Sequence, residues 1–239
     1  MLKSLIEADK LHQDWELAIL DDNSPIPVQD IVEEEMVGHL EKIRIENSNM
    51  SFEDKMQRGL VLGEYANRAI RESEADIGIL LCDDDELVPE YLKQVSDYFE
   101  TNKHVKYCYS KIYVFNPFVV DTKLQKCDNN KYNQWIGPIN PVGKVDASQV
   151  AWRLSCCKED QAWFQETTKK AEEGPFLHDT DYGFFSNLHS KCGLCHQSNL
   201  YAQYKGIHEH QLLWHKKGNS GSLRIYFDNI EQLGKNELL

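Results

Sequence analysis

The segment DIGILLCDDDELVPEYL, residues 76–92, constrains the fold more than any other part of the sequence. Its apolar run has the length of a buried strand and ends at Asp83, Asp84 and Asp85. Pro89 then precedes a segment with apolar residues on one face, which predicts a helix, because the first helical turn tolerates proline. The three carboxylates are therefore expected where a strand ends and a helix follows. In open α/β sheets that edge binds ligands.

A second stretch repeats this pattern nearer the N-terminus. Residues 15–24, WELAILDDNS, form an apolar strand-like segment that ends at Asp21 and Asp22. Adjacent carboxylates repel one another unless a cation or solvent screens them. One interpretation is a solvated acidic loop that caps the next helix. Because two strands deliver acids to one expected edge, the pattern favours a ligand-binding or metal-binding site.

This order of segments resembles the GT-A glycosyltransferases, in particular the inverting family-2 type that uses nucleotide-diphospho-sugars. That family has a strand ending in DDxS, a helix with an Asn-Arg stretch, and a strand ending in a DxD-like cluster. A proline follows the metal-binding Asp of that cluster by five residues, so Pro89 assigns the metal position to Asp84. The usual first Asp of the cluster is Cys82 here, and Asp83 would have to make any ribose contact.

The resemblance implies a Rossmann-like α/β fold with a mixed, mainly parallel sheet flanked by helices. A single domain is expected over residues 1–239, with the nucleotide-sugar half at about 1–115 and the acceptor half at about 116–239. In the family a strand precedes the first helix, which corresponds here to residues 2–11. That first strand, which supplies part of the base pocket, is expected to be missing from the sequence as given.

The resemblance also implies a divalent cation, Mn²⁺ or Mg²⁺, that holds the diphosphate of the donor. Asp84 is the expected ligand, joined by Asp83 or Asp85. The segment around His208 resembles the closing Tyr-Arg-x-His of the family, and an imidazole suits manganese beside carboxylate oxygens. The cation would act as a Lewis acid on the departing nucleotide.

Further donor contacts are assigned by the same resemblance. Asp22 matches the position that hydrogen-bonds the base, most often uracil, so a UDP-sugar is the expected donor. Asn67 lies in the Asn-Arg stretch and is assigned to the donor site. Arg58, near the start of the predicted helix over residues 52–70, is assigned to a phosphate contact, although a lone surface arginine is more often solvated.

The acceptor side is expected in the second half of the chain. Asp179 or Asp181 matches the general base that takes the proton of the acceptor hydroxyl, a task for which a carboxylate within hydrogen-bonding reach suffices. Asp146 matches an acceptor-side Asp of some members, or else accepts hydrogen bonds within a loop. Trp152 offers a ring that could stack on a sugar, or is buried in the core.

Composition excludes some partners. With 26 Lys and Arg against 39 Asp and Glu, the net charge of −13 opposes binding to nucleic-acid backbones and anionic membranes. No apolar run reaches the roughly 18 residues of a membrane span, and the first residues lack the apolar region of a signal peptide. A cytoplasmic protein with reduced thiols is expected from these features and from its seven cysteines.

Three other functions compete with sugar transfer. The C-x-x-C-H spacing of Cys192, Cys195 and His196, close to His189, suggests a zinc-stabilised interaction protein, but by family order residues 191–195 belong to a strand. Nucleotidyl transfer needs a Gly-rich loop with a basic residue after the first strand, and that stretch is missing. A nucleotide-sugar or carbohydrate-binding module would lack a catalytic base.

Overall fold

Helices and strands are mixed along the described residues. The computed structural model describes residues 1–21, 24, 26–48, 62–83, 85–115, 133–165 and 180–206. The helices are α1 (Leu2–Asp9), α2 (Val28–Glu35), α4 (Leu62–Glu72), α5 (Tyr91–Thr101), α6 (Ser155–Lys158) and α7 (Thr180–Cys192), with short 3-10 turns η1 (Leu40–Lys42) and η2 (Ala147–Gln149). The strands are β1 (Leu17–Asp21), β2 (Ile43–Asn47), β3 (Ile77–Ile79), β4 (Asp85–Leu87), β5 (Tyr107–Phe115), β6 (Val150–Arg153) and β7 (His196–Gly206).

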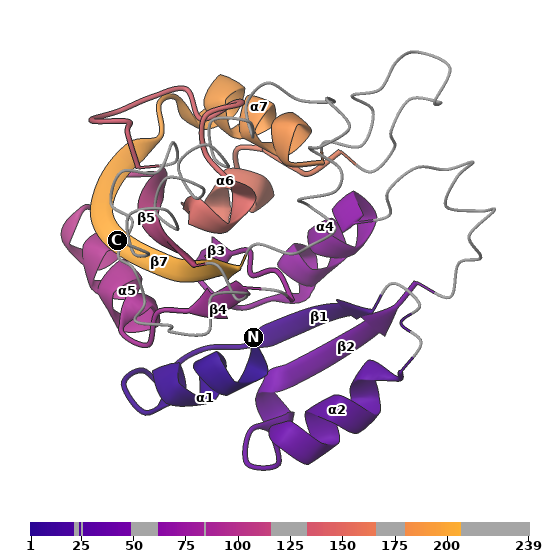
Figure 1. The fold of residues 1–239 in the computed structure, drawn as a ribbon. Coiled ribbons are helices and arrows are strands. Elements are labelled where there is room, and N and C mark those ends of the chain that lie inside the picture. The colour runs from indigo at the N-terminus through magenta and orange to yellow at the C-terminus, as the bar shows by residue number, and fades with distance from the viewer. Residues whose placement is uncertain are drawn as a thin grey trace, which may run out of the picture.

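Strands β1 and β2 form a small parallel sheet, and α1 and α2 lie below it in Figure 1. The register pairs Leu17 with Ile43 at one end and Asp21 with Asn47 at the other. Because the strands are parallel, their carboxyl ends lie at the same edge. The pairing therefore brings the polar residues Asp21 and Asn47 together, as the end of the WELAIL strand predicts.

The larger sheet has the strand order β3-β6-β5-β7-β4 and curls around the helices above it (Figure 1). Among the described strands, β5 pairs with β7 in parallel, whereas β3·β6, β5·β6 and β4·β7 are antiparallel. The expected mixed α/β architecture is confirmed. In the larger sheet β3, β5 and β7 run in one direction and β4 and β6 run in the other, so its described strands are mixed rather than mainly parallel.

Each face of the larger sheet carries its own apolar cluster. Successive strand residues point to opposite faces, and Tyr107 and Tyr109 accordingly pack in one cluster while Cys108 packs in the other. Helix α5 covers the Cys108 face with its buried side chains Val95 and Phe99. This is the amphipathic helix that the residues after Pro89 predict.

The expected strand over residues 191–195 is wrong, because helix α7 continues to Cys192. Gly193 ends it with a φ of +86°, a left-handed conformation that glycine adopts without a steric penalty. Its amide donates to the carbonyl of His189 at 3.1 Å. Strand β7 begins only at His196, so Cys192 and Cys195 lie on opposite sides of a tight turn.

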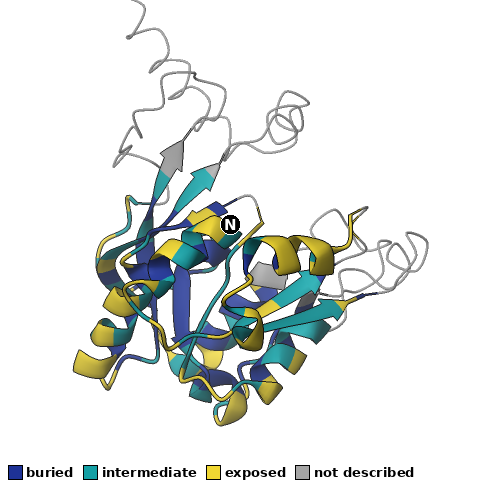
Figure 2. Ribbon diagram, turned by 90° about the horizontal axis from the view of Figure 1, so that it is seen from below, coloured by how far each residue is buried: buried dark blue, intermediate teal, exposed yellow. Residues whose placement is uncertain are grey.

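A wide hollow of about 1960 Å³ lies between the two sheets. Its lining includes residues 17–20 of β1, residues 76–81 around β3, and Met1 at the start of α1. Among the described strands, β1 pairs with β2 alone and β3 with β6 alone, and Figure 2 shows residues of β1 and β2 as intermediate in burial. Ligand pockets usually measure about 300–1,000 Å³. The hollow exceeds that range.

Candidate functional site

Asp21 ties together the ends of the two parallel strands. Its side chain is buried, and Oδ1 accepts a hydrogen bond from the Ser24 amide at 2.9 Å. Its carbonyl accepts from the Ser48 amide at 3.0 Å. In the amide orientation that satisfies both groups, Asn47 donates to Asp21 Oδ2 at 3.0 Å. The first Asp of the DDNS sequence therefore shapes the strand end.

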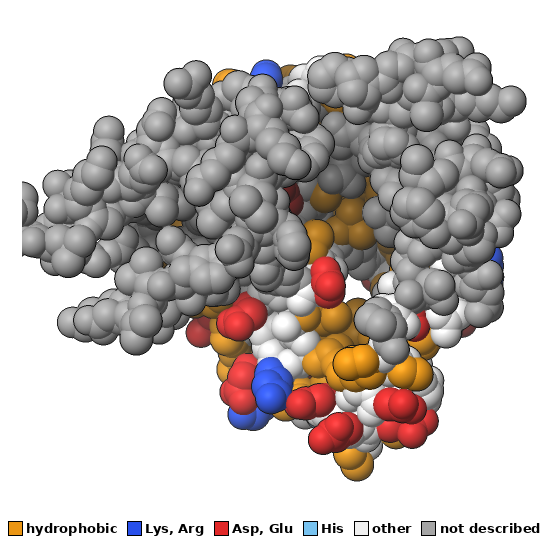
Figure 3. All heavy atoms as spheres, turned by 45° about the vertical axis from the view of Figure 1, so that its right-hand side comes forward, with side chains coloured by type: hydrophobic (Ala, Val, Ile, Leu, Met, Phe, Trp, Pro, Cys, Tyr) orange, Lys and Arg blue, Asp and Glu red, His pale blue; other side chains and the backbone are white. Residues whose placement is uncertain are grey.

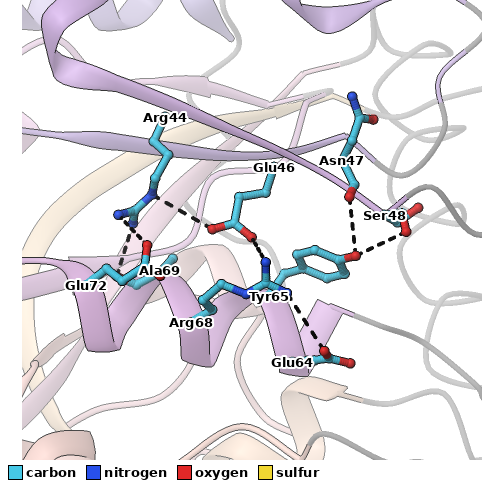
Figure 4. A network of polar contacts seen from close by, with 9 residues as sticks. All are labelled: Arg44, Glu46, Asn47, Ser48, Glu64, Tyr65, Arg68, Ala69 and Glu72. Atoms are coloured by element: carbon cyan, nitrogen blue, oxygen red, sulfur yellow. Dashed lines mark hydrogen bonds and ion pairs between the residues drawn. The ribbon is translucent and has the colours of Figure 1, made fainter.

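A network of charged residues fixes helix α4 against strand β2 (Figure 4). Glu46 lies between two arginines, 3.0 Å from Arg68 and 3.9 Å from Arg44. Arg44 also contacts Glu72 at 2.9 Å, and the Tyr65 hydroxyl donates to the carbonyl of Ser48 at 3.2 Å. The Arg of the Asn-Arg stretch thus holds the helix on the sheet.

Asn67, which the sequence assigned to the donor site, is fully buried on α4. Its Nδ2 donates to the carbonyl of Phe164 at 2.9 Å, and its Oδ1 accepts from the amide of the same residue at 2.9 Å. The side chain therefore joins the first half of the chain to the second. This contact gives Asn67 a structural role, and its contact with a donor stays a prediction.

Replacing Asn67 with Ala is expected to destabilise the protein by about 2–4 kcal/mol, because two buried backbone groups of Phe164 lose a partner worth about 1–3 kcal/mol each. Urea unfolding measures the loss. Asn102→Ala is the matched control, since Asn102 makes one half-buried bond to the Tyr98 carbonyl. An unchanged stability combined with a lost affinity for UDP would instead assign Asn67 to donor binding.

The DDD segment splits into residues with different surroundings. Asp83 is exposed and lines the hollow, whereas Asp85 begins β4 and is 0% exposed. In the β4·β7 register Asp85 lies directly opposite Lys205, whose Nζ is 3.7 Å from Asp85 Oδ2. The Asp85 carboxylate therefore lies inside the sheet beside an ammonium, and its role as a metal ligand stays a prediction.

Lys205 joins Asp85 to Asp146 in the second half of the chain. The Lys205 Nζ lies 3.2 Å from Asp146 Oδ2, and its side chain is only 14% exposed. Burial lowers the pKa of Lys205, but the carboxylates of Asp146 and Asp85 outweigh burial and raise the pKa above its usual range. The ammonium is thus held charged between two acids. Sequence reasoning missed Lys205, since no motif marks a lysine that β-strand register places opposite an acid.

Asp146 also forms a capping box at η2. Its Oδ1 accepts from the Ser148 amide at 3.2 Å, and the Gln149 side chain accepts from the Asp146 amide at 2.9 Å. The alternative of a loop Asp that accepts backbone hydrogen bonds therefore describes this residue. Its acceptor-side role stays a prediction.

Trp152 is a core residue in this structure. Its side chain is 3% exposed, and its ring packs edge-on against Phe164 and Phe184, with ring centroids 6.1 Å and 5.0 Å away. The alternative of a tryptophan in the core describes this residue, and its contact with a sugar stays a prediction.

Several predicted residues lie outside the described residues and stay predictions. Asp181 belongs to helix α7 by its backbone, but its side chain is not described. The predicted site residues that lie wholly outside the described ranges are Asp22, Arg58, Asp84, Asp179 and His208.

Both halves of the chain contribute to the same hollow. From the first half, Ser24 and Asp83 line it beyond the ends of β1 and β3; from the second half, Ala147 and Tyr204 line it. Ala147 follows Asp146 and Tyr204 precedes Lys205 in the sequence. The ion pair between Lys205 and Asp146 therefore lies beside this lining. Figure 3 shows hydrophobic side chains among acidic ones on the described part of one face. The convergence expected of Asp22, Asp84 and the Asp179–Asp181 pair lies outside the described residues and stays a prediction.

Comparisons with known proteins identify the fold. No protein-family model matches the sequence, and no curated protein matches it closely. The structure is similar to a crystal structure of S. aureus TarS in complex with UDP-GlcNAc, with a TM-score of 0.61 and 16% identity over 87% of this chain and 54% of that one. It is also similar to glucosyl-3-phosphoglycerate synthase from Mycobacterium tuberculosis in complex with phosphoglyceric acid, with a TM-score of 0.51 and 12% identity over 89% of this chain and 69% of that one.

The chain spans about half the length of the TarS chain that it matches. Within the described residues, no helix has the length and apolar character to cross a bilayer. The arrangement of strands and helices, together with these structural neighbours, shows that the chain has the GT-A glycosyltransferase fold.

Proposed function

We propose that the protein is a metal-dependent glycosyltransferase that moves a sugar from a nucleotide-diphospho-sugar, a UDP-sugar in the first place, to an acceptor hydroxyl with inversion. The observation that carries the proposal is the hollow that both halves line, with Asp83, in the segment between β3 and β4, among its lining residues. In the GT-A fold this is the edge where strand ends meet a ligand. The TarS neighbour, solved with UDP-GlcNAc, supports the donor class.

A divalent cation fits the exposed part of the DDD segment. The carboxylate of Asp83 is open to the hollow, and carboxylate oxygens are preferred ligands of Mg²⁺ and Mn²⁺. Asp85 is directed at Lys205, so we assign the ion to Asp84 with Asp83, and His208 remains a further candidate ligand. When bound, the ion stabilises the charge that develops on the departing diphosphate.

The protein supplies a base on the acceptor side. Asp179 or Asp181 takes the proton from the acceptor hydroxyl while its oxygen bonds to the anomeric carbon and the nucleotide diphosphate leaves from the opposite face. A carboxylate suits this step because the hydroxyl loses its proton only as the new bond forms. Asp146 is retained as the acceptor-side acid, since its neighbour Ala147 lines the hollow.

Release of UDP from a panel of UDP-sugars, measured with Mn²⁺, with Mg²⁺ and with a chelator, tests the proposal. We expect turnover with one sugar, and no turnover once the chelator is present. Inversion is read from the anomeric configuration of the product by NMR. Tight binding of a UDP-sugar without UDP release would instead indicate a binding module, and release of pyrophosphate from a nucleoside triphosphate would indicate nucleotidyl transfer.

A further inference from the structure

Two cysteines and an aspartate lie close together where helices α6 and α7 end. Cys156 lies on α6, Asp160 follows that helix, and Cys192 is the last residue of α7. The sulfur atoms and a carboxylate oxygen of these residues all lie within 4.8 Å of one another. Cys156 is fully buried, and the other two are partly exposed.

These distances suit a tetrahedral metal site. Zinc binds thiolate sulfur at about 2.3 Å and carboxylate oxygen at about 2.0–2.2 Å, so its ligand atoms lie roughly 3.6–3.8 Å apart. The Cys192 sulfur lies 3.7 Å from Asp160 Oδ2. The three ligand atoms therefore need only small movements to surround an ion.

The local charges also suit a divalent cation. Two thiolates and one carboxylate around such an ion leave one net negative charge, and Lys106 lies beside them with its Nζ 2.9 Å from Asp160 Oδ2. Lys106 is 42% exposed, so its ammonium can shift toward water and still balance the site. The cluster and this lysine together become neutral when the ion is bound.

We propose that Cys156, Asp160 and Cys192 bind a divalent metal ion that prefers thiolates, zinc in the first place, with water as the fourth ligand. Thiolates select zinc over Mg²⁺ and Mn²⁺, so this site differs in chemistry from the one proposed for the donor diphosphate. The ion links α6 to α7, the helix that carries Asp181, and so anchors the acceptor half of the chain.

This ligand set differs from the C-x-x-C-H pattern. Cys195 is fully buried, and its backbone pairs with Ile139 in an isolated bridge. His196 packs its ring against His104, with ring centroids 5.9 Å apart. Of the pattern's residues, Cys192 alone belongs to the described group of possible ligands.

Metal loading of the whole chain under reducing conditions tests the proposal. After incubation with Zn²⁺ and removal of the excess by desalting, we expect one equivalent of zinc per chain by elemental analysis. Loading with Co²⁺ should give the intense absorption of a tetrahedral cobalt thiolate, which an oxygen-ligated site does not give. Cys192→Ser and Asp160→Asn should each lose both signals.

Two cysteines serve as matched controls. Cys157→Ser changes the residue next to Cys156; the Cys157 sulfur donates to the Ala162 carbonyl at 3.1 Å. Cys195→Ser tests the other cysteine of the C-x-x-C pattern. Both should bind zinc like the unchanged protein. Cys156→Ser should lose zinc as well. If this variant fails to fold, alkylation of Cys192 in the unchanged protein replaces it, since bound zinc should slow alkylation about tenfold or more.

Three results would overturn the proposal. They are absence of zinc after loading, loss of zinc in Cys195→Ser but not in Cys192→Ser, and equal alkylation of Cys192 with and without the metal. A disulfide between Cys156 and Cys192 that persists under reductant would likewise replace the metal site by a covalent link.

Discussion

Replacing Asp84 with Ala is expected to reduce metal-dependent UDP release by about 100-fold or more, while the protein stays folded. The reason is that a Lewis-acid metal lowers the barrier by several kcal/mol, and each 1.4 kcal/mol corresponds to a factor of ten in rate. Initial rates of UDP release at saturating UDP-sugar, measured over a range of Mn²⁺ concentrations, determine the effect.

A matched control for this substitution is Asp97→Ala. Asp97 lies on the outer face of α5 and pairs with Lys93 at the surface, with a side chain that is 64% exposed. This variant should keep full activity. Asp85→Asn provides a second comparison, because the contact of Asp85 with Lys205 predicts a loss of stability as its main effect. Full activity of Asp84→Ala would remove the metal assignment.

The sequence predicts the elements of the first half well, and the physical reason is local. The apolar run before the DDD segment, the amphipathic face after Pro89 and the strand before Asp21 each have a period that their own residues determine. The pattern did not predict β4, which begins at Asp85 between that run and helix α5. The order of motifs then indicates the fold.

The sequence could not predict which acid of the DDD segment turns inward. Three adjacent aspartates look alike, and Asp85 is selected only because β4 pairs with β7, far along the chain, in a register that sets it opposite Lys205. The burial of Trp152 likewise depends on aromatic residues from two other segments, Phe164 and Phe184. Such contacts belong to tertiary packing and leave no local pattern.

The cysteines illustrate the same limit. The spacing of Cys192 and Cys195 suggests that they act together, but Gly193 ends helix α7 between them. The packing of α6 against α7 instead brings Cys192 to Cys156. A short spacing in sequence therefore predicted the wrong neighbour.

Replacing Lys205 with Met is expected to destabilise the protein by about 3–5 kcal/mol, the range for removing one partner of a buried ion pair. The substitution keeps much of the apolar stem but leaves the buried Asp85 and the nearby Asp146 without the ammonium between them. Urea unfolding at neutral pH measures the change. Lys93→Met is the control, because the Lys93–Asp97 pair is exposed on both sides and should contribute little.

A second variant separates the loss of the ion pair from simple loss of packing. Asp85→Leu combined with Lys205→Met removes both the buried carboxylate and its ammonium, so it should recover part of the stability that Lys205→Met loses. If both variants are equally unstable, the apolar stem of Lys205 matters more than its charge.

The pH dependence follows from the raised pKa of Lys205, whose ordinary value is 10.5. A group whose pKa is higher in the folded state contributes its full stabilisation below the ordinary value and loses it as the pH rises through the folded value. The unchanged protein should therefore lose stability above about pH 10.5 more steeply than Lys205→Met. Parallel curves for the two proteins in that range would show that Lys205 is not held charged by its two acids.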